Sequence, residues 1–407
     1  MPDNLRPKLR SLQASAAQLS GQQVLVLQDP LGVSDRTFAV PRVIVPFLEL
    51  CDGTRDVGTL RAALELRAGL KVGPEYLEKM IAELDEALLL DNERFAEAYQ
   101  EAVGRYRAAP ARAPTLAGSV YPDDPDELER TIKGYFDGTP GRARSSGTDK
   151  VRGLVSPHID YQRGSSIYAQ VWDRARESVR SAEVVVLLGT NHLECQRMLT
   201  LTRQSYSTPW GPLTTADGVV NRVAADLGEG VFAEELHHRS EHSIEIAAVW
   251  LHYLVRDGSC ELVPVLCGSF QRFVEGNGSP DEDDEIAAFV DAVNESTAGR
   301  RTLIVAAGDL AHMGPAFGDS FPMDAPRKGD LSAADGELMS AIASGDADGM
   351  FALVKGEGDR RRVCGLAPIY LALRLLGETT GEVTGYSQCP ADQLGTSCVS
   401  VCGVVLR

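Results

Sequence analysis

The alternation of hydrophobic and polar residues divides the chain into two regions with different patterns. From Val151 onward, short runs that are apolar on both faces alternate with amphipathic helical segments. The apolar runs are residues 153–155, 184–188, 262–266 and 302–307. Strands that are apolar on both faces are typical of a sheet buried between layers of helices. The pattern therefore predicts an α/β fold with a central sheet flanked by helices.

The N-terminal region has a different order of elements. Residues 24–27 and 37–40 predict two short strands, each followed by a turn or a proline. Residues 59–68 and 74–88 carry apolar side chains at helical spacing. A short β-pair combined with small helices is typical of a winged-helix fold, so we expect a small α+β domain over residues 1–107.

An alanine- and proline-rich segment separates the two patterns. Residues 108–114 read Ala-Ala-Pro-Ala-Arg-Ala-Pro, which favours neither a helix nor a strand. We expect residues 108–117 to form an exposed linker, and residues 118–407 to form the α/β domain with its own core.

Charge and composition exclude some classes of partner. The chain of 407 residues has 40 Lys+Arg against 58 Asp+Glu, a formal net charge of −18. This balance argues against nucleic acid and against an anionic membrane surface as the main partner. No apolar run approaches the roughly 18 residues of a membrane-spanning helix. With a polar N-terminus and eight cysteines that form no CxxC pair, we expect a cytoplasmic protein; its oligomeric state stays open.

Histidines follow the ends of several predicted strands. His158, His192 and His312 each come after an apolar run and a small residue, and His242 opens an apparent helix. In open α/β sheets, ligands bind outside the carboxyl ends of the strands. Shared placement of these histidines predicts one convergent site.

Cys364 stands just before an apolar helical segment, residues 369–376. A helix N-terminus favours the thiolate, which is the form that binds metals or undergoes redox chemistry. A buried structural cysteine is the alternative interpretation, as it is for the other cysteines.

The order of these motifs resembles the Memo family, often called AmmeMemoRadiSam system protein B in bacteria and archaea. The matching motifs are Gly118-Ser119-Val120-Tyr121-Pro122, Pro157-His158, Gly189-Thr190-Asn191-His192, Glu241-His242-Ser243-Ile244-Glu245, Asp309-Leu310-Ala311-His312 and Cys364-Gly365. Residues 48–55 and 81–89 resemble the PqqD-like family of winged-helix domains, which bind peptide segments beside radical-SAM enzymes. The resemblance thus implies a radical-SAM enzyme and a peptide segment as partners.

The Memo resemblance also implies a fold like that of the class III extradiol dioxygenases and one bound transition-metal ion. Carried across, the metal ligands are His158, His192 and Cys364. A thiolate in place of a carboxylate moves the metal preference from iron toward copper or zinc. Three protein ligands leave one position open.

Further residues are expected around that open position. Asp309, His312 and His242 are expected as acid/base groups. Glu245, three residues after His242 on one helix, is expected to orient that ring.

The sequence departs from the family pattern beside the first ligand. The family's Pro-His-Ala-Gly-Tyr is here Pro-His-Ile-Asp-Tyr, so Asp160 either adds a carboxylate to the site or caps a turn, and the cap is favoured. The second histidine that often follows the ligand His192 is replaced by Leu193. For the adjacent His237 and His238, a solvated loop is the favoured interpretation over adventitious metal binding.

The resulting hypothesis is a metal-dependent oxidoreductase that uses copper or iron and acts with a radical-SAM partner system. Two alternatives remain. One is a non-catalytic metal-binding scaffold that presents a peptide to a radical-SAM enzyme. The other is a zinc-dependent hydrolase that uses Asp309 or His312 as its base.

Overall fold

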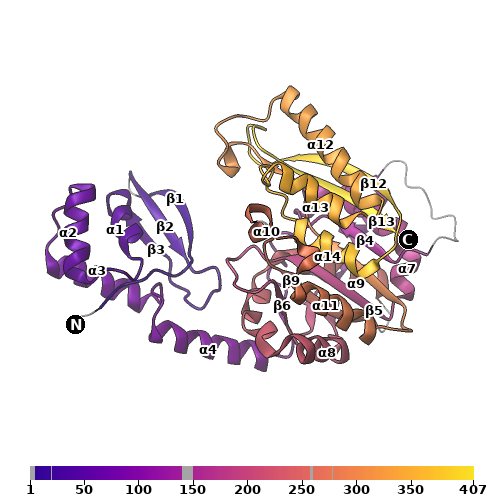
Figure 1. Ribbon diagram of the computed structural model, residues 1–407, viewed down its shortest axis with the longest axis horizontal. Coiled ribbons are helices and arrows are strands. Elements are labelled where there is room, and N and C mark those ends of the chain that lie inside the picture. The colour runs from indigo at the N-terminus through magenta and orange to yellow at the C-terminus, as the bar shows by residue number, and fades with distance from the viewer. Residues whose placement is uncertain (1–4, 20, 140–149, 257–259, 277) are drawn as a thin grey trace. The chain divides into compact units, whose positions relative to one another are not determined.

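The computed structural model describes residues 5–19, 21–139, 150–256, 260–276 and 278–407 (Figure 1). The chain divides into two compact units, Met1–Ala109 and Pro110–Arg407. Among the described residues, no helix combines the length and the apolar character that a membrane crossing requires.

The N-terminal unit combines a small antiparallel sheet with helices. The sheet has the order β1-β2-β3, with strands β1 (Gln13–Leu19), β2 (Gln22–Gln28) and β3 (Phe38–Pro41). The helices are α1 (Val45–Leu50), α2 (Val57–Ala68), α3 (Pro74–Glu86) and α4 (Glu93–Ala108). Leu60, Leu64, Leu77 and Leu84 are completely or almost completely buried at the centre of this unit.

Both predicted strands and both predicted helices of this unit are present. Pro74 occupies the first turn of α3, where its missing N–H costs nothing. The pattern did not predict β1, because its residues are almost all exposed and show no apolar alternation.

The second unit is built on a mixed sheet of eight strands with the order β11-β13-β4-β10-β5-β9-β6, and β12 also pairs with β13. Its centre is parallel, formed by β4 (Gly153–Ser156), β10 (Thr302–Ala307), β5 (Val184–Thr190) and β9 (Glu261–Cys267). The outer strands are β6 (Leu199–Leu201), β11 (His312–Met313), β12 (Gly381–Pro390) and β13 (Cys398–Leu406). A separate hairpin pairs β7 (Tyr206–Thr208) with β8 (Gly211–Leu213).

Alternate residues of the central strands pack into different cores, as the predicted α/β fold requires. Val184 and Val186 of β5 join one core, whereas Val185 and Leu187 join the other. Helices α8 (Asp217–Leu227), α11 (Asp284–Ser296), α12 (Ala325–Ala343), α13 (Ala347–Gly356) and α14 (Leu366–Leu376) contribute to the first core. Helices α5 (Pro125–Gly138), α6 (Tyr161–Arg174), α7 (Arg176–Ser181) and α9 (His242–Val255) contribute to the second. The short helix α10 (Gln271–Glu275) follows β9.

The expectation of an exposed linker over residues 108–117 fails at Arg112, the one buried residue of this segment. The Arg112 side chain is buried in the second unit, where it donates hydrogen bonds to the carboxylate of Glu245 and to the carbonyl oxygens of His238 and Glu241. Local composition could not show this, because the carboxylate that pairs with Arg112 lies 133 residues later in the chain.

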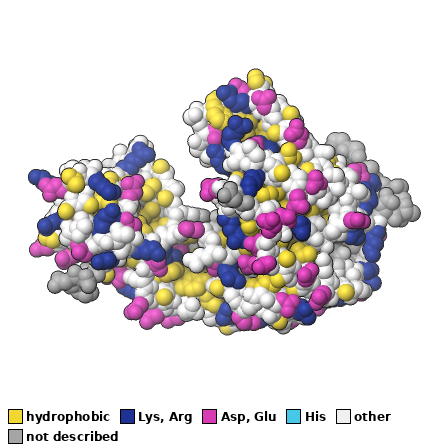
Figure 2. Space-filling model, in the orientation of Figure 1, with side chains coloured by type: hydrophobic (Ala, Val, Ile, Leu, Met, Phe, Trp, Pro, Cys, Tyr) yellow, Lys and Arg dark blue, Asp and Glu magenta, His cyan; other side chains and the backbone are white. Residues whose placement is uncertain are grey.

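On the face shown in Figure 2, Lys and Arg side chains are scattered among Asp and Glu side chains. The described residues on that face therefore do not gather their cations into a single patch.

Candidate metal centre

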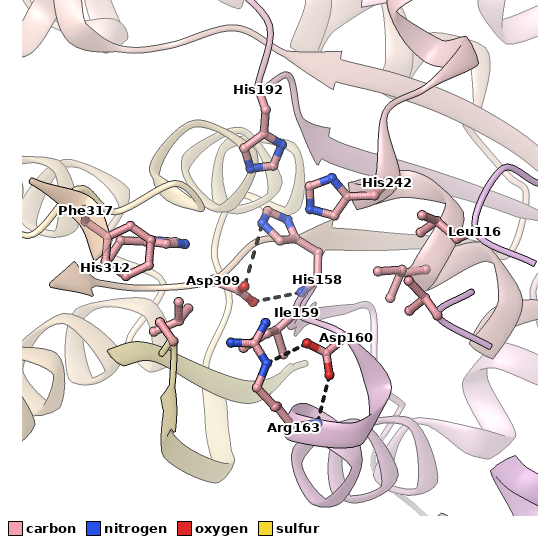
Figure 3. A pocket seen from close by; sticks show the side chains of 14 residues that line it. Leu116, His158, Ile159, Asp160, Arg163, His192, His242, Asp309, His312 and Phe317 are labelled. Atoms are coloured by element: carbon pink, nitrogen blue, oxygen red, sulfur yellow. Dashed lines mark hydrogen bonds and ion pairs between the residues drawn. The ribbon is translucent and has the colours of Figure 1, made fainter. Parts of the chain in front are cut away.

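The candidate centre lies at the carboxyl edge of three neighbouring strands. His158 follows β4, Asp309 follows β10 and His192 follows β5, and these strands are adjacent in the sheet. His242 is the first residue of α9. Parallel strands end at one edge of a sheet, so side chains that immediately follow them come together there (Figure 3).

Cys364 reaches the same edge because two glycines let the backbone segments approach closely. A Cβ atom built on Gly308, directly after β10, would lie 2.5 Å from the Cα atom of Gly365. Only a residue without a side chain fits at that distance. The turn that carries Cys364 therefore packs directly against the end of β10.

The structure brings together the three residues expected as ligands. One donor atom each of His158, His192 and Cys364 lies within 4.8 Å of the others. The Cys364 Sγ atom is 3.2 Å from His158 Nε2. In a tetrahedral site, nitrogen and sulfur ligands of one ion are about 3.5 Å apart, given bonds of about 2.0 and 2.3 Å. The spacing and chemistry of this donor set fit a single transition-metal ion.

Hydrogen bonds fix how the two histidines face this position. His158 Nδ1 is 3.1 Å from the carbonyl oxygen of Ala307, and His192 Nδ1 is 3.0 Å from Oε1 of Glu241. Each Nδ1–H can donate to its oxygen, which leaves each Nε2 lone pair for a metal. Burial, together with the neighbouring His192 and His242, lowers the pKa of His158 well below its usual value, so its ring stays neutral.

The thiol of Cys364 differs from the expectation based on its helix. Burial raises the pKa of Cys364 well above its usual value, and the nearby carboxylate of Asp309 raises it further. These two effects outweigh the dipole of α14. The metal-free site thus holds a thiol, and a bound cation would have to displace its proton.

Glu241 lies at this site, although the sequence interpretation assigned it no role. Its side chain is 2% exposed, and its oxygens accept hydrogen bonds from the backbone N–H groups of His192, His242 and Ser243. Its Oε1 atom also lies 3.0 Å from Nδ1 of His192 and 3.1 Å from Nδ1 of His242. Burial alone would raise the pKa of Glu241, but the hydrogen bonds from His192 and His242 hold that pKa well below its usual value.

His192, Glu241 and His242 also have donor atoms close enough to hold a metal. However, the Glu241 oxygens already accept three backbone N–H groups and face two imidazole N–H groups. We therefore interpret Glu241 as a carboxylate that positions the two rings.

A cavity of about 470 Å³ opens in front of His158 and His192. Asp309, His312 and His242, the expected acid/base groups, all line it. His312 Nδ1 is 3.0 Å from the carbonyl oxygen of Arg362, which leaves Nε2 available. Asp309 accepts a hydrogen bond of 2.8 Å from the backbone N–H of His158.

The local electrostatics give these groups different protonation behaviour. Burial raises the pKa of Asp309 and lowers the pKa of His312. Burial would also lower the pKa of His242, but the hydrogen bond and charge of Glu241 raise it above its usual value. An imidazole with a lowered pKa and one with a raised pKa therefore face the same cavity, a combination suited to moving protons.

The structure places Glu245 away from His242 and corrects the role expected for it. The Glu245 carboxylate accepts hydrogen bonds from the backbone N–H of Leu116, from Tyr121 Oη and from the guanidinium of Arg112. The ring of His242 is oriented by Glu241, its neighbour in sequence. Helical spacing alone did not show that the first turn of α9 directs Glu245 toward residues 112–121.

Asp160 has the capping role that was favoured for it. It is the N-cap of α6, accepts a hydrogen bond of 3.1 Å from the backbone N–H of Arg163 and pairs with that side chain. It also lines the cavity.

His237 and His238 do not lie in a solvated loop, contrary to expectation. Both are buried. His238 Nδ1 lies 2.6 Å from Tyr206 Oη and its Nε2 lies 3.0 Å from the carbonyl oxygen of Thr200. Hydrogen bonds to residues more than 30 positions away hold this ring in the core.

Fold and site together define a mixed α/β protein with a His–His–Cys group at the carboxyl edge of its central sheet. The family model for Memo-like proteins matches residues 112–405, and the chain belongs to this family.

Its similarity to individual relatives is moderate but extensive. A MEMO1 family protein of Aquifex aeolicus is 28% identical over 386 residues, which cover 93% of this chain and 95% of the relative. One from Methanosarcina barkeri is 28% identical over 285 residues, covering 68% of this chain and 92% of the relative. One from Thermus thermophilus is 26% identical over 321 residues, covering 79% and 90%. The Aquifex aeolicus alignment is longer than the second unit, so it extends into the N-terminal unit.

Proposed function

We propose that this protein holds one copper or iron ion through His158, His192 and Cys364 and acts as a metal-dependent oxidoreductase. The observation that carries the proposal is the convergence of two imidazole nitrogens and one thiol sulfur, with both imidazoles lining a cavity. Two imidazoles and a thiolate are ligands that copper and iron accept. The position at the carboxyl edge of the sheet also supports an arrangement like that of the class III extradiol dioxygenases.

A bound ion of this kind would supply one-electron chemistry at its open position. The residues of the chain would orient the two imidazole rings and exchange protons. His158 and His192 hold their rings through Ala307 and Glu241. His312 takes up a proton at Nε2, and Asp309 exchanges a proton at its carboxyl, which burial makes easier to protonate.

The test is anaerobic purification followed by elemental analysis and back-titration of the metal-free protein with copper(I), iron(II) and zinc(II). We expect one equivalent of copper or iron, and loss of that equivalent in Cys364→Ser. Cys195→Ser is the matched control, because Cys195 is also partly exposed and belongs to neither of the two His, Cys and carboxylate groups found among the described residues. Stoichiometric zinc with no bound copper or iron would instead support the hydrolase alternative. Absence of any bound metal would contradict the proposal.

We also propose that the N-terminal unit is a PqqD-like domain that presents a peptide segment to a radical-SAM partner. The support is a three-stranded sheet in which β1 and β3 are both outer strands. Each has an edge to which an extended peptide could add as a further strand. Hydrogen exchange of the full chain, with and without the radical-SAM protein and its peptide, should show added protection in β1 or β3. Unchanged exchange in both strands would contradict this role.

A further inference from the structure

One wall of the cavity carries a cation that the metal centre does not use. Arg163, in the first turn of α6, lines the cavity together with His158 and His192, and it is the only Lys or Arg among the described residues that do so. Its side chain is 38% exposed, and Figure 3 shows it among the side chains around the cavity. Arg163 is paired with Asp160, which also lines the cavity, so what it offers a ligand is an oriented N–H donor.

The guanidinium of Arg163 is held in place from one side. Its Nε atom donates to Asp160 Oδ2 at 2.5 Å, and its Nη1 atom donates to the carbonyl oxygen of Pro390 at 2.9 Å. Asp160 is itself fixed as the N-cap of α6. An arginine has five N–H donors, and these bonds use two of them. Within the described part of the chain, Nη2 has no hydrogen-bond partner and remains available to a ligand.

The same cavity has apolar walls. Ile159, Phe317 and Val399 line it, and Ile159 and Val399 are almost completely buried. A pocket that combines apolar walls with one oriented guanidinium suits a small organic molecule that carries an anionic group. The planar fork of arginine can donate to the oxygen atoms of a carboxylate or a phosphate. In Arg163, Nη2 is the nitrogen of that fork left for such a contact.

We propose that this cavity binds a small organic oxyanion, a carboxylate or a phosphate ester, through Nη2 of Arg163. The apolar part of the ligand contacts Ile159 and Phe317. The inference rests on the proposed function in one respect, because it places the remainder of the ligand beside the metal ligands His158 and His192.

The test uses the metal-free full chain, so that it does not depend on the metal. Benzoate, phenyl phosphate and the neutral benzamide are titrated by calorimetry or by NMR shift perturbation. We expect at least one of the two anions to bind more tightly than benzamide. Arg163→Gln should weaken anion binding by about tenfold or more and leave benzamide unchanged, because a hydrogen bond to a charged group is lost. Arg163→Lys should retain part of the affinity, since it keeps the charge without the fork.

Arg176→Gln is the matched control. Arg176 also pairs with an aspartate three residues earlier, Asp173, but it does not line this cavity. Its substitution should not change anion binding. The choice between benzoate and phenyl phosphate identifies the anionic group.

The inference is overturned if neither anion binds the unsubstituted protein more tightly than benzamide. It is also overturned if Arg163→Gln binds the anions as tightly as the unsubstituted protein does. A separate metal titration distinguishes the two proposals. If the protein binds no metal, the result of the anion titration still stands, and if it binds no anion, the result of the metal titration still stands.

Discussion

Replacement of Glu241 by glutamine should weaken metal binding although Glu241 is not itself a ligand. The carboxylate fixes the ring of His192 through Nδ1 and fixes its backbone through the N–H group. Glutamine has nearly the same shape, but it has one acceptor oxygen in place of two and carries no charge. In the variant, an NH₂ group therefore replaces one of the two carboxylate oxygens. That NH₂ group cannot accept the hydrogen bonds that the oxygen accepts in the unsubstituted protein.

The magnitude follows from the contacts that are lost. If the amide oxygen replaces Oε1, the NH₂ group faces the backbone N–H of His192, which is 2.9 Å from Oε2 in the structure. In the opposite orientation, the backbone N–H groups of His242 and Ser243 lose their acceptor. Loss of a hydrogen bond to a charged group costs about 1.5–3 kcal/mol. Loss of a carboxylate that orients a ligand histidine typically reduces metal affinity about 10- to 100-fold.

The assay is a competition titration of the metal-free protein against a chelator of known affinity, with urea unfolding measured in parallel. Glu245→Gln is the matched control. It removes another buried carboxylate from the same helix, and the hydrogen bonds of that carboxylate go to Arg112, Thr115, Leu116 and Tyr121. We expect both variants to lose stability and only Glu241→Gln to lose metal affinity by tenfold or more. Equal affinities in the two variants would refute the positioning role of Glu241.

The remaining predictions concern the thiol, a close backbone contact and acid stability. Cys364→Ser should reduce copper(I) affinity at least 100-fold in the same titration, whereas Cys195→Ser should leave it unchanged; equal losses would contradict a specific sulfur ligand. Gly308→Ala should destabilise the fold by about 1–3 kcal/mol in urea unfolding, because its Cβ atom would lie 2.5 Å from the Cα atom of Gly365; unchanged stability would contradict that contact. Burial alone would raise the pKa of Glu245, but its arginine partner and hydrogen bonds lower it. The Glu245 carboxylate therefore stabilises the fold above its pKa in the unfolded chain, about 4.3. This stabilisation is lost as the pH falls through the lower pKa that Glu245 has in the folded protein. Below about pH 4.5, the free energy of unfolding should fall less steeply with decreasing pH in Glu245→Gln than in the unsubstituted protein. The same pH dependence in both proteins would contradict this reasoning.

The sequence was sufficient for features that depend on local order along the chain. The apolar runs predicted the central parallel strands, and the residues just after them predicted where His158 and His192 would lie. Both predictions need only the rule that parallel strands end at one edge of a sheet. Cys364 could be placed at that edge only through the family resemblance, because nothing local shows that its turn packs against Gly308.

Features that depend on distant partners could not be predicted in this way. Arg112 lies in an alanine- and proline-rich segment, and its burial follows from Glu245 and from two carbonyl groups far along the chain. Glu241 belongs to the motif Glu241-His242-Ser243-Ile244-Glu245. Its role, however, depends on its contact with His192, which lies 49 residues earlier in the chain. The protonation state of Cys364 depends on how deeply the finished fold buries its thiol. In each case the deciding interaction is tertiary.

The most direct test of the metal centre is X-ray absorption at the edge of the bound metal in the unsubstituted protein and in Cys364→Ser. The account predicts one sulfur neighbour at about 2.3 Å and two imidazole nitrogens at about 2.0–2.1 Å, with the sulfur absent from the variant. A spectrum with only nitrogen and oxygen neighbours in the unsubstituted protein, or one unchanged by Cys364→Ser, would contradict the His158–His192–Cys364 centre.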